Sequence, residues 1–470
     1  MRMKLSYYCL FIVISIFLHV LIHYTLADVS PSPKVKTLIM LNRIEEKEKY
    51  TNFFNSLVKR RHALFFKSAS DESTVLESHG KSLYNNVIIF APGVDEFGGF
   101  EVSDLEHFVN QHAGNVLIGL DKSAGHAIRQ FVKRCGAKIP KKGAEVIDHF
   151  SFWENSTVNQ NYNVGERDNE VDNVNPHTIV YGGKLLSNDI LLMKHQRLDG
   201  TSASGKVSSM SQILFKGTHL LLNTKKKGSL LFGILRAKRT TYSADDKKEI
   251  KNIESKNTGK RIVLIGGLQA RNNARIIISG SNAMFANEFS SNNQDFIASI
   301  TKWNFLETGK IRVSFRKHKL EENNNSQNIL LASTTEDNSV YTVTNRIKYS
   351  LMVEEYRHSN NKWIPFIGED LQLELVLLDP VLRMNLKHDG NGRYSTIFDL
   401  PNQFGIYKLR FVYDRSPSYT IIETVDTITV RPKKLKQYSK FVSLSYPYFI
   451  SVVTLQIGWV FFGAKLYFYL

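Results

Sequence analysis

Cysteine is almost absent from this chain, which has 2 cysteines in 470 residues. Cys9 lies in the N-terminal segment that we expect to be removed, so Cys135 has no intramolecular partner for a disulfide. Cys135 is near the end of a predicted helix among apolar neighbours, which favours a buried small side chain over a nucleophile. The fold must therefore be stabilised by packing alone.

Several sequence motifs of catalysis are also missing. The chain has no G-x-G-x-x-G after a predicted strand, no G-x-S-x-G and no H-E-x-x-H. These absences argue against a dinucleotide loop, an α/β-hydrolase nucleophile and a zinc-protease site. Asp148 and His149 are adjacent, but neighbouring residues of a strand point to opposite faces, so we interpret them as a structural pair. Paired carboxylates for glycoside hydrolysis stay open, because their separation depends on the fold.

Long apolar runs occur only at the two ends of the chain. Arg2 and Lys4 precede the run Leu10 to Ile22, and Thr25-Leu26-Ala27 offers small residues at signal-peptidase spacing. Residues 1–27 are therefore predicted to be a secretory signal peptide. The run at residues 446–467 reaches the roughly 20 residues that cross about 30 Å of hydrocarbon, so we predict one transmembrane helix there.

This pair of runs predicts a single-pass type I membrane protein with its bulk in the lumen. Five basic residues precede the second run, against the positive-inside tendency: Arg431, Lys433, Lys434, Lys436 and Lys440. A signal peptide should override them, since long translocating domains cross largely regardless of charge. In this orientation Asn155 and Asn324, each followed by the N-x-Ser/Thr pattern, are glycosylation acceptors. The net charge of +17 then favours an anionic membrane surface or acidic partners over nucleic acid.

The first part of the body alternates short apolar runs with helical periodicity. Residues 28–150 are predicted to form a Rossmann-like α/β domain with a parallel sheet, and residues 151–320 a second α/β region. Three polar insertions interrupt the second region, at residues 154–175, 196–210 and 236–257. Ligands of such sheets lie at strand carboxyl ends, which here carry Asp95, Asp121 and Lys122. We favour ordinary loop polar groups and a helix N-cap over a site at these three positions.

After a polar linker the period changes from 3.6 to 2. Residues 329–432 are predicted to form an immunoglobulin-like β-sandwich, with a hairpin turn at Asp389-Gly390-Asn391-Gly392. The fold class expected for the whole chain is thus α/β followed by all-β and one transmembrane helix.

One internal segment is unusually dense in hydrogen-bonding groups, and we predict it as a polar loop between two strands. It runs from Gly266 to Arg275 and contains Gln269, Arg271, Asn272, Asn273 and Arg275. Amides both donate and accept, and guanidinium forks suit carboxylates, carbonyls or phosphate. The segment either ties two domains together, which we favour, or binds a polar ligand.

The same segment, with Ser279-Gly280-Ser281, closely resembles the signature of the DDOST/Wbp family, the non-catalytic subunits of oligosaccharyltransferase complexes of the endoplasmic reticulum. Further matches follow in order along the chain: Asn86 to Pro92, Phe97-Gly98-Gly99, Val146 to His149, Tyr341 to Thr344, Trp363 to Phe366, Asp379-Pro380 and Ser445 to Tyr448. The three polar insertions depart from the family pattern.

The resemblance implies a lumenal scaffold in the endoplasmic-reticulum membrane that supports N-glycosylation and carries no cofactor. The catalytic multi-spanning subunit, ribophorin-like subunits and the small defender-against-death subunit would be its partners, with catalysis on the first of these. Two other classes of protein remain open: a single-pass surface receptor or adhesion protein, and a lumenal enzyme of unknown type.

Overall fold

The computed structural model describes residues 35–153, 176–186, 213–222, 230–245, 257–321, 340–358, 361–438 and 443–469. The predicted signal peptide and the two sequon asparagines, Asn155 and Asn324, lie outside these residues. The chain divides into two compact units, which are described separately. The first is Met1–Lys310, Tyr356–Lys362 and Arg415–Ile421, and the second is Ile311–Glu355, Trp363–Asp414 and Ile422–Leu470.

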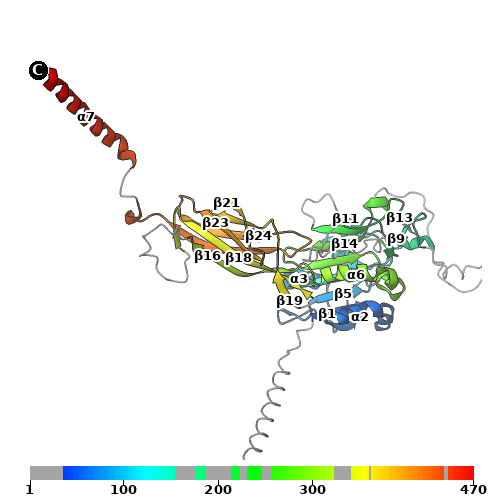
Figure 1. Cartoon of the computed structure of the whole chain (residues 1–470). Helices are drawn as coiled ribbons and strands as arrows, with labels where there is room; N and C mark the ends of the chain where they lie inside the picture. The colour runs from blue at the N-terminus through cyan, green and yellow to red at the C-terminus, as the bar shows by residue number, and fades with distance from the viewer. Residues whose placement is uncertain are drawn as a thin grey trace, which may run out of the picture. The chain divides into compact units, whose positions relative to one another are not determined.

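A seven-stranded mixed sheet is the centre of the first unit (Figure 1). Its strands, in spatial order, are β12 (Leu231–Arg236), β14 (Val263–Gln269), β15 (Arg275–Ser279), β6 (Asn115–Gly119), β5 (Asn86–Phe90), β1 (Val35–Leu41) and β2 (His62–Ser68). The five strands from β15 to β2 run parallel, while β12 and β14 are antiparallel to their neighbours. The predicted parallel sheet is confirmed, and it has an antiparallel edge.

Helices cover both faces of this sheet. The helices are α2 (Thr51–Lys59), α3 (Val102–His112), α4 (His126–Arg134) and α6 (Ser290–Asn304). Successive β1 residues enter different cores: Leu38 and Met40 pack with α3 and α4, whereas Ile39 and Leu41 pack with α2 and α6. Strands buried on both faces read as continuous apolar runs, which is why the sequence signals them clearly.

Four short ribbons complete the first unit. They pair β3 (Glu77–Ser78) with β4 (Lys81–Ser82), β7 (Ala137–Lys138) with β11 (Leu221–Leu222), β8 (Ala144–Ile147) with β13 (Tyr242–Asp245), and β9 (Val180–Tyr181) with β10 (Leu214–Phe215). Short 3-10 helices occupy Ile44–Tyr50, Pro176–Thr178, Gly259–Arg261, Ala283–Phe285 and Asn287–Phe289.

The second unit contains two five-stranded sheets. One consists of β16 (Ile311–Leu320), β18 (Arg346–Arg357), β23 (Arg393–Asp399), β22 (Lys387–His388) and β19 (Lys362–Pro365), and the other of β17 (Val340–Thr342), β25 (Ile422–Arg431), β24 (Gly405–Tyr413), β20 (Gln372–Val376) and β21 (Pro380–Asn385). Buried residues alternate with half-buried residues along β18 and mostly with exposed residues along β24, as in sheets with one covered face. The hairpin turn at 389–392 joins β22 and β23 as predicted. The immunoglobulin-like arrangement stays a prediction.

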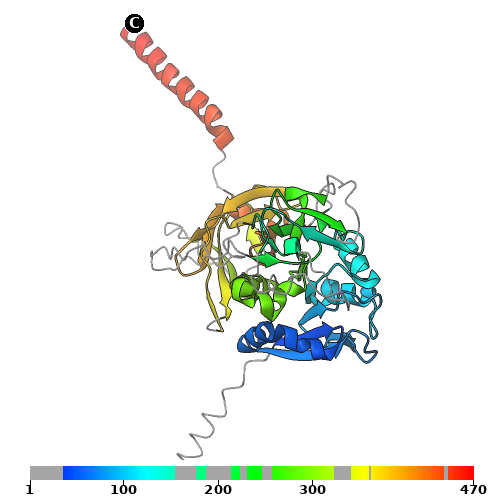
Figure 2. The same ribbon diagram turned by 90° about the vertical axis from the view of Figure 1, so that its right-hand side faces the viewer.

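The last described helix, α7 (Tyr446–Tyr469), is one unbroken apolar helix (Figure 2). Among the described residues it is the one helix long and apolar enough to cross a membrane. Two further 3-10 turns, Leu435–Gln437 and Ser443–Ser445, precede it.

The structure differs from the sequence-based expectations at several element boundaries. Strands from the ranges 28–150 and 151–320 share one sheet, and Ile311–Leu320 pairs with β18 in the second unit. The third predicted insertion contains β13, which pairs with β8. Within the range predicted as a β-sandwich, β17 and β18 are separated at Thr344, whose φ of 65° is left-handed. The differences in strand pairing arise from contacts between residues far apart in the chain, which local patterns do not contain.

Candidate functional site

The predicted polar loop is the tight end of a β-hairpin. β14 continues to Gln269, which pairs with Arg275 at the start of β15, so the expectation of a loop from Gly266 is wrong for its first four residues. The Ala270 N–H donates to the Ala274 carbonyl at 2.8 Å, and Asn273 has a φ of 70°. Asparagine tolerates this left-handed conformation better than most residues. We call residues 269–275 the signature hairpin.

Arg275 lies in the interior with no exposed surface. Its Nη1 donates to the carbonyls of Trp303 at 2.7 Å and Thr308 at 2.9 Å, and its Nε donates to Gln269 Oε1 at 3.3 Å. The guanidinium also lies over the Trp303 ring, 4.8 Å from its centroid. Burial lowers the pKa of Arg275 to about 9, so the side chain remains a cation at neutral pH.

Two amides of the signature hairpin bind the segment Arg415–Ile421. Gln269 Nε2 donates to the Tyr419 carbonyl at 2.8 Å. Asn273 forms a reciprocal pair with Ile421: its Nδ2 donates to the Ile421 carbonyl at 2.9 Å, and its Oδ1 accepts from the Ile421 N–H at 2.5 Å. These bonds supply partners for backbone groups of a segment that has no regular secondary structure.

The segment Arg415–Ile421 belongs to the first unit, although it connects β24 and β25 of the second unit. Trp303 Nε1 donates to the Pro417 carbonyl at 2.8 Å, and the Thr420 N–H donates to the Gly309 carbonyl at 2.9 Å. Gly309 has a φ of 70°, and a Cβ there would lie 2.2 Å from the Ser418 carbonyl oxygen. The signature hairpin therefore fixes a segment whose two ends continue into the other unit.

The remaining two signature residues are exposed on the turn. Asn272 Nδ2 donates to the carbonyls of Val109 at 2.7 Å and Asn110 at 2.9 Å, near the end of α3. These carbonyls belong to the last turn of the helix, where carbonyl groups have no N–H partner within the helix. Arg271 forms no side-chain hydrogen bond with the described residues. Of the two predicted guanidinium forks, only Arg275 is used inside the fold.

The polar residues at the strand carboxyl ends have local roles. The Asp95 carboxylate accepts the His126 N–H in the first turn of α4 at 2.9 Å and the Lys142 ammonium at 3.3 Å. These hydrogen bonds hold the pKa of Asp95 below its usual value. Asp121 accepts the Lys122 N–H at 2.7 Å, and Lys122 Nζ lies 3.5 Å from Glu145 Oε2. Asp95 thus binds the N-terminus of a helix, in agreement with the sequence-based preference for a structural role over a ligand site at this position.

Asp148 is fully buried and uses both carboxylate oxygens. Oδ1 accepts the N–H groups of Phe150 and Ser151 at 2.9 and 3.0 Å, and Oδ2 accepts the hydroxyls of Thr240 and Thr241 at 2.7 and 2.8 Å. Burial on its own would raise the pKa of Asp148, but these hydrogen bonds outweigh it and lower the pKa. This carboxylate connects the loop after β8 to the loop before β13.

His149 and Cys135 do not complete a catalytic pair. His149 is exposed and shares a 2.7 Å hydrogen bond with the Tyr242 hydroxyl. Cys135 packs against the core beside α3 and α4, where burial and, second, the charge of Glu106 raise the pKa of its thiol to about 12. A thiol with so high a pKa is a poor nucleophile.

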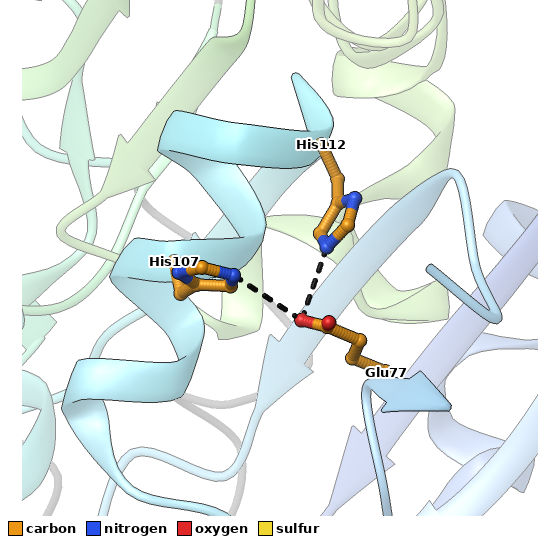
Figure 3. A group of neighbouring side chains, drawn as sticks. All are labelled: Glu77, His107 and His112. Atoms are coloured by element: carbon orange, nitrogen blue, oxygen red, sulfur yellow. Dashed lines mark hydrogen bonds and ion pairs between the residues drawn. The ribbon is translucent and has the colours of Figure 1, made fainter. Parts of the chain in front are cut away.

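The fold also gathers two clusters that sequence reasoning missed. Glu307 is buried, and its Oε1 lies 2.9 Å from Arg60 Nη1 and 3.0 Å from His62 Nε2, while its Oε2 lies 3.9 Å from His358 Nε2. Glu77, His107 and His112 form the second cluster (Figure 3). No local signal reveals either cluster, because each joins residues that are far apart in the chain. Glu307 follows His62 by 245 positions, and His112 follows Glu77 by 35.

The architecture defines the class: a mixed α/β domain, a strand-rich second unit and one apolar C-terminal helix. A family model described as OST48, N-terminal domain, matches residues 29–307, and a second, described as OST48 middle domain, matches residues 322–470. The chain therefore belongs to the OST48 family.

Relatives of known name match almost the whole chain. Each is named dolichyl-diphosphooligosaccharide–protein glycosyltransferase 48 kDa subunit. The protein of Caenorhabditis elegans is 31% identical over 94% of this chain and 91% of its own length, and that of Drosophila melanogaster is 31% identical over 90% and 88%. The protein of Danio rerio is 29% identical over 90% and 89%.

A solved structure of a ThuA-like protein from Parabacteroides merdae is also similar. It is 13% identical with a TM-score of 0.29, covering 58% of this chain and 90% of that one. This similarity is too low to inform fold or function.

Proposed function

We propose that this chain is a non-catalytic subunit of an oligosaccharyltransferase complex. It would support transfer of a dolichol-linked oligosaccharide to Asn in N-x-Ser/Thr sequons by holding the complex together. The observation that carries this proposal is the similarity to 48 kDa subunits of that glycosyltransferase over about nine-tenths of both chains, 94% and 91% for the worm protein.

The bonding of the candidate residues supports a scaffold over an enzyme. Gln269, Asn273 and Arg275 direct their polar atoms to backbone groups of the same unit. Asp148 has four hydrogen-bond partners, and a carboxylate in that state is not available as a general base. Side chains that form hydrogen bonds within the fold stabilise the shape of the surface around them. A scaffold protein needs a surface of fixed shape.

The proposed location is the endoplasmic-reticulum membrane, with α7 as a single type I anchor and the bulk of the chain in the lumen. All side chains described in α7 are exposed, so the apolar surface of this helix needs lipid or partner helices around it. The proposed partners are the catalytic multi-spanning subunit, ribophorin-like subunits and the small defender-against-death subunit. No nucleic acid is expected among them.

Affinity purification of the tagged full chain in mild detergent tests this function. We expect the catalytic subunit to co-purify, together with transfer of oligosaccharide to a peptide that contains N-x-Ser/Thr. The variant Asp95→Asn, at an exposed carboxylate, should leave the transfer rate per complex unchanged. Recovery of the folded chain at the plasma membrane, or without a catalytic subunit, would contradict the proposal.

A further inference from the structure

Two imidazoles and one carboxylate converge at the edge of the first unit. Glu77 belongs to β3, whereas His107 and His112 both belong to α3 (Figure 3). Glu77 Oε2 lies 3.3 Å from His107 Nε2 and 3.0 Å from His112 Nε2. One ligand atom from each of the three residues lies within 4.8 Å of the other two. In Figure 3 both rings point toward the carboxylate.

The elements that carry these side chains are held firmly. Leu76, next to Glu77, and Phe108, next to His107, are buried in the same core. A capping box at Glu101 and Asp104 fixes the start of α3, and Asn272 binds carbonyls near its end. The donors therefore converge because packed elements place them there, which lowers the cost of organising a site.

An ion pair alone would stabilise this arrangement little. The side chain of His107 is 54% exposed and that of Glu77 is 33% exposed. Exposed pairs of this kind contribute roughly 0 to 1 kcal/mol, because solvent screens them and ordering the side chains costs entropy. The convergence of both imidazoles on one carboxylate oxygen is better matched by a cation that all three bind.

We propose that Glu77, His107 and His112 form a Zn²⁺ site. Imidazole nitrogen and carboxylate oxygen are typical zinc donors, and a set of two histidines and one glutamate is a known three-ligand type. At Zn–N distances of about 2.0 to 2.1 Å, tetrahedral donors lie about 3.4 Å apart. The two measured separations, 3.0 and 3.3 Å, are close to this value.

Three protein ligands leave a fourth coordination position, which water would fill. A cavity of about 260 Å³ adjoins the cluster, and Glu77 and His107 line it together with Asp104 and apolar side chains. The ion would fasten the β3–β4 ribbon to α3 and leave its open position beside this cavity. The site does not depend on the role of the chain in a complex.

Zinc titration of the metal-stripped full chain in detergent, against a chromophoric chelator, tests the proposal. We expect one Zn²⁺ per chain, and at least about tenfold weaker binding in His112→Ala and in Glu77→Gln. The matched control is His126→Ala, which removes an exposed histidine of α4 outside the cluster. Co²⁺ bound at the same site should give the visible absorption of a tetrahedral ion in the wild type and lose it in both variants.

Circular dichroism separates loss of binding from loss of folding. Glu77→Gln keeps the size of the side chain, so its spectrum without metal should equal that of the wild type. Absence of saturable binding by the wild type, or equal affinity in wild type, His112→Ala and Glu77→Gln, would overturn the proposal and leave an ion pair only.

Discussion

At the scale of single residues, the strongest determinant of the signature hairpin is Arg275, a buried cation whose hydrogen-bond partners are carbonyl and amide oxygens. Burying a charge is costly unless its hydrogens are paired. The guanidinium meets this need through Nη1 and Nε, which join β15 to the end of α6 and to Thr308, whereas Nη2 has no hydrogen-bond partner among the described residues. Its replacement would leave those oxygens unpaired in the interior.

We therefore expect Arg275→Met to lower the free energy of unfolding by about 3 kcal/mol, because several buried oxygen atoms lose their hydrogen-bond donor. Denaturant unfolding of the full chain in detergent measures the change. Arg271→Met, four positions earlier and exposed, is the matched control and should stay within about 0.5 kcal/mol of the wild type. Equal effects of the two substitutions would refute the assigned role of Arg275.

Glu307 makes the stability of the fold depend on pH. Burial opposes its ionisation, but the hydrogen bond from His62 and the charges of Arg60, His62 and His358 lower its pKa below the ordinary 4.5. A group whose pKa is depressed by folding stabilises the native state above its ordinary pKa. That contribution is lost as the pH falls through the lowered value.

Glu307→Gln should accordingly cost about 2 kcal/mol of unfolding free energy at neutral pH, because Arg60 loses its buried partner. The difference from the wild type should shrink as the pH falls below 4.5. Thermal unfolding at a series of pH values measures it, with Glu48→Gln on the exposed surface as control. A difference that persists unchanged in acid would show that the charge of Glu307 is irrelevant.

At the scale of elements, the signature hairpin also caps a helix. The two amide hydrogens of Asn272 bind carbonyls near the end of α3, so we expect Asn272→Ala to weaken that turn by about 1 kcal/mol. Amide hydrogen exchange at the C-terminal end of α3 should then rise about fivefold, whereas Arg271→Ala in the same turn should leave it unchanged.

Asn272→Asp sharpens this test. It keeps the oxygen that accepts the Ala274 N–H but places a negative charge beside helix carbonyls, which is unfavourable at a helix C-terminus. Exchange in α3 should be at least as fast as in Asn272→Ala. Slower exchange than in the alanine variant would mean that the turn, and not the cap, controls the helix.

The elements differ in how far the sequence could predict them. β5 and β6 are continuous apolar runs, and α3 and α4 have clear 3.6 periodicity, so the sequence indicates all four within the α/β domain predicted at residues 28–150. β13 is a polar strand formed only by pairing with β8, and nothing in its local composition indicates it. The hydrogen-bonding character of residues 269–275 was visible in the sequence, whereas their backbone partners at 303, 308, 419 and 421 required the fold.

At the scale of the whole molecule, the order of the chain hides how its units are built. Residues 356–362 and 415–421 belong to the first unit, although the strands around them belong to the second. A single domain boundary in the sequence cannot describe two units whose residues alternate along the chain in this way. The same long-range contacts bring Glu307 to Arg60 and Glu77 to His112, which explains why neither cluster could be predicted from spacing.

Membrane topology is the property of the whole chain that the proposed function needs most. The 24 residues of α7 extend about 36 Å at 1.5 Å per residue, which exceeds the roughly 30 Å of a hydrocarbon core. Lys465 lies near its end, where a long side chain can reach the interface. With the signal peptide predicted at residues 1–27, α7 should stop translocation and leave the residues before it in the lumen.

Protease added to sealed microsomes should therefore leave the part of the chain before α7 intact, and the same part should be digested once detergent opens the vesicles. Endoglycosidase should increase the electrophoretic mobility of the wild type but not of a variant with both Asn155→Gln and Asn324→Gln, because these are the expected acceptors. The basic residues before α7 favour the opposite orientation, so the experiment decides between two opposing signals. Digestion of the bulk of the chain in intact vesicles would show that the flanking charge prevails, and a lumenal scaffold would then be impossible.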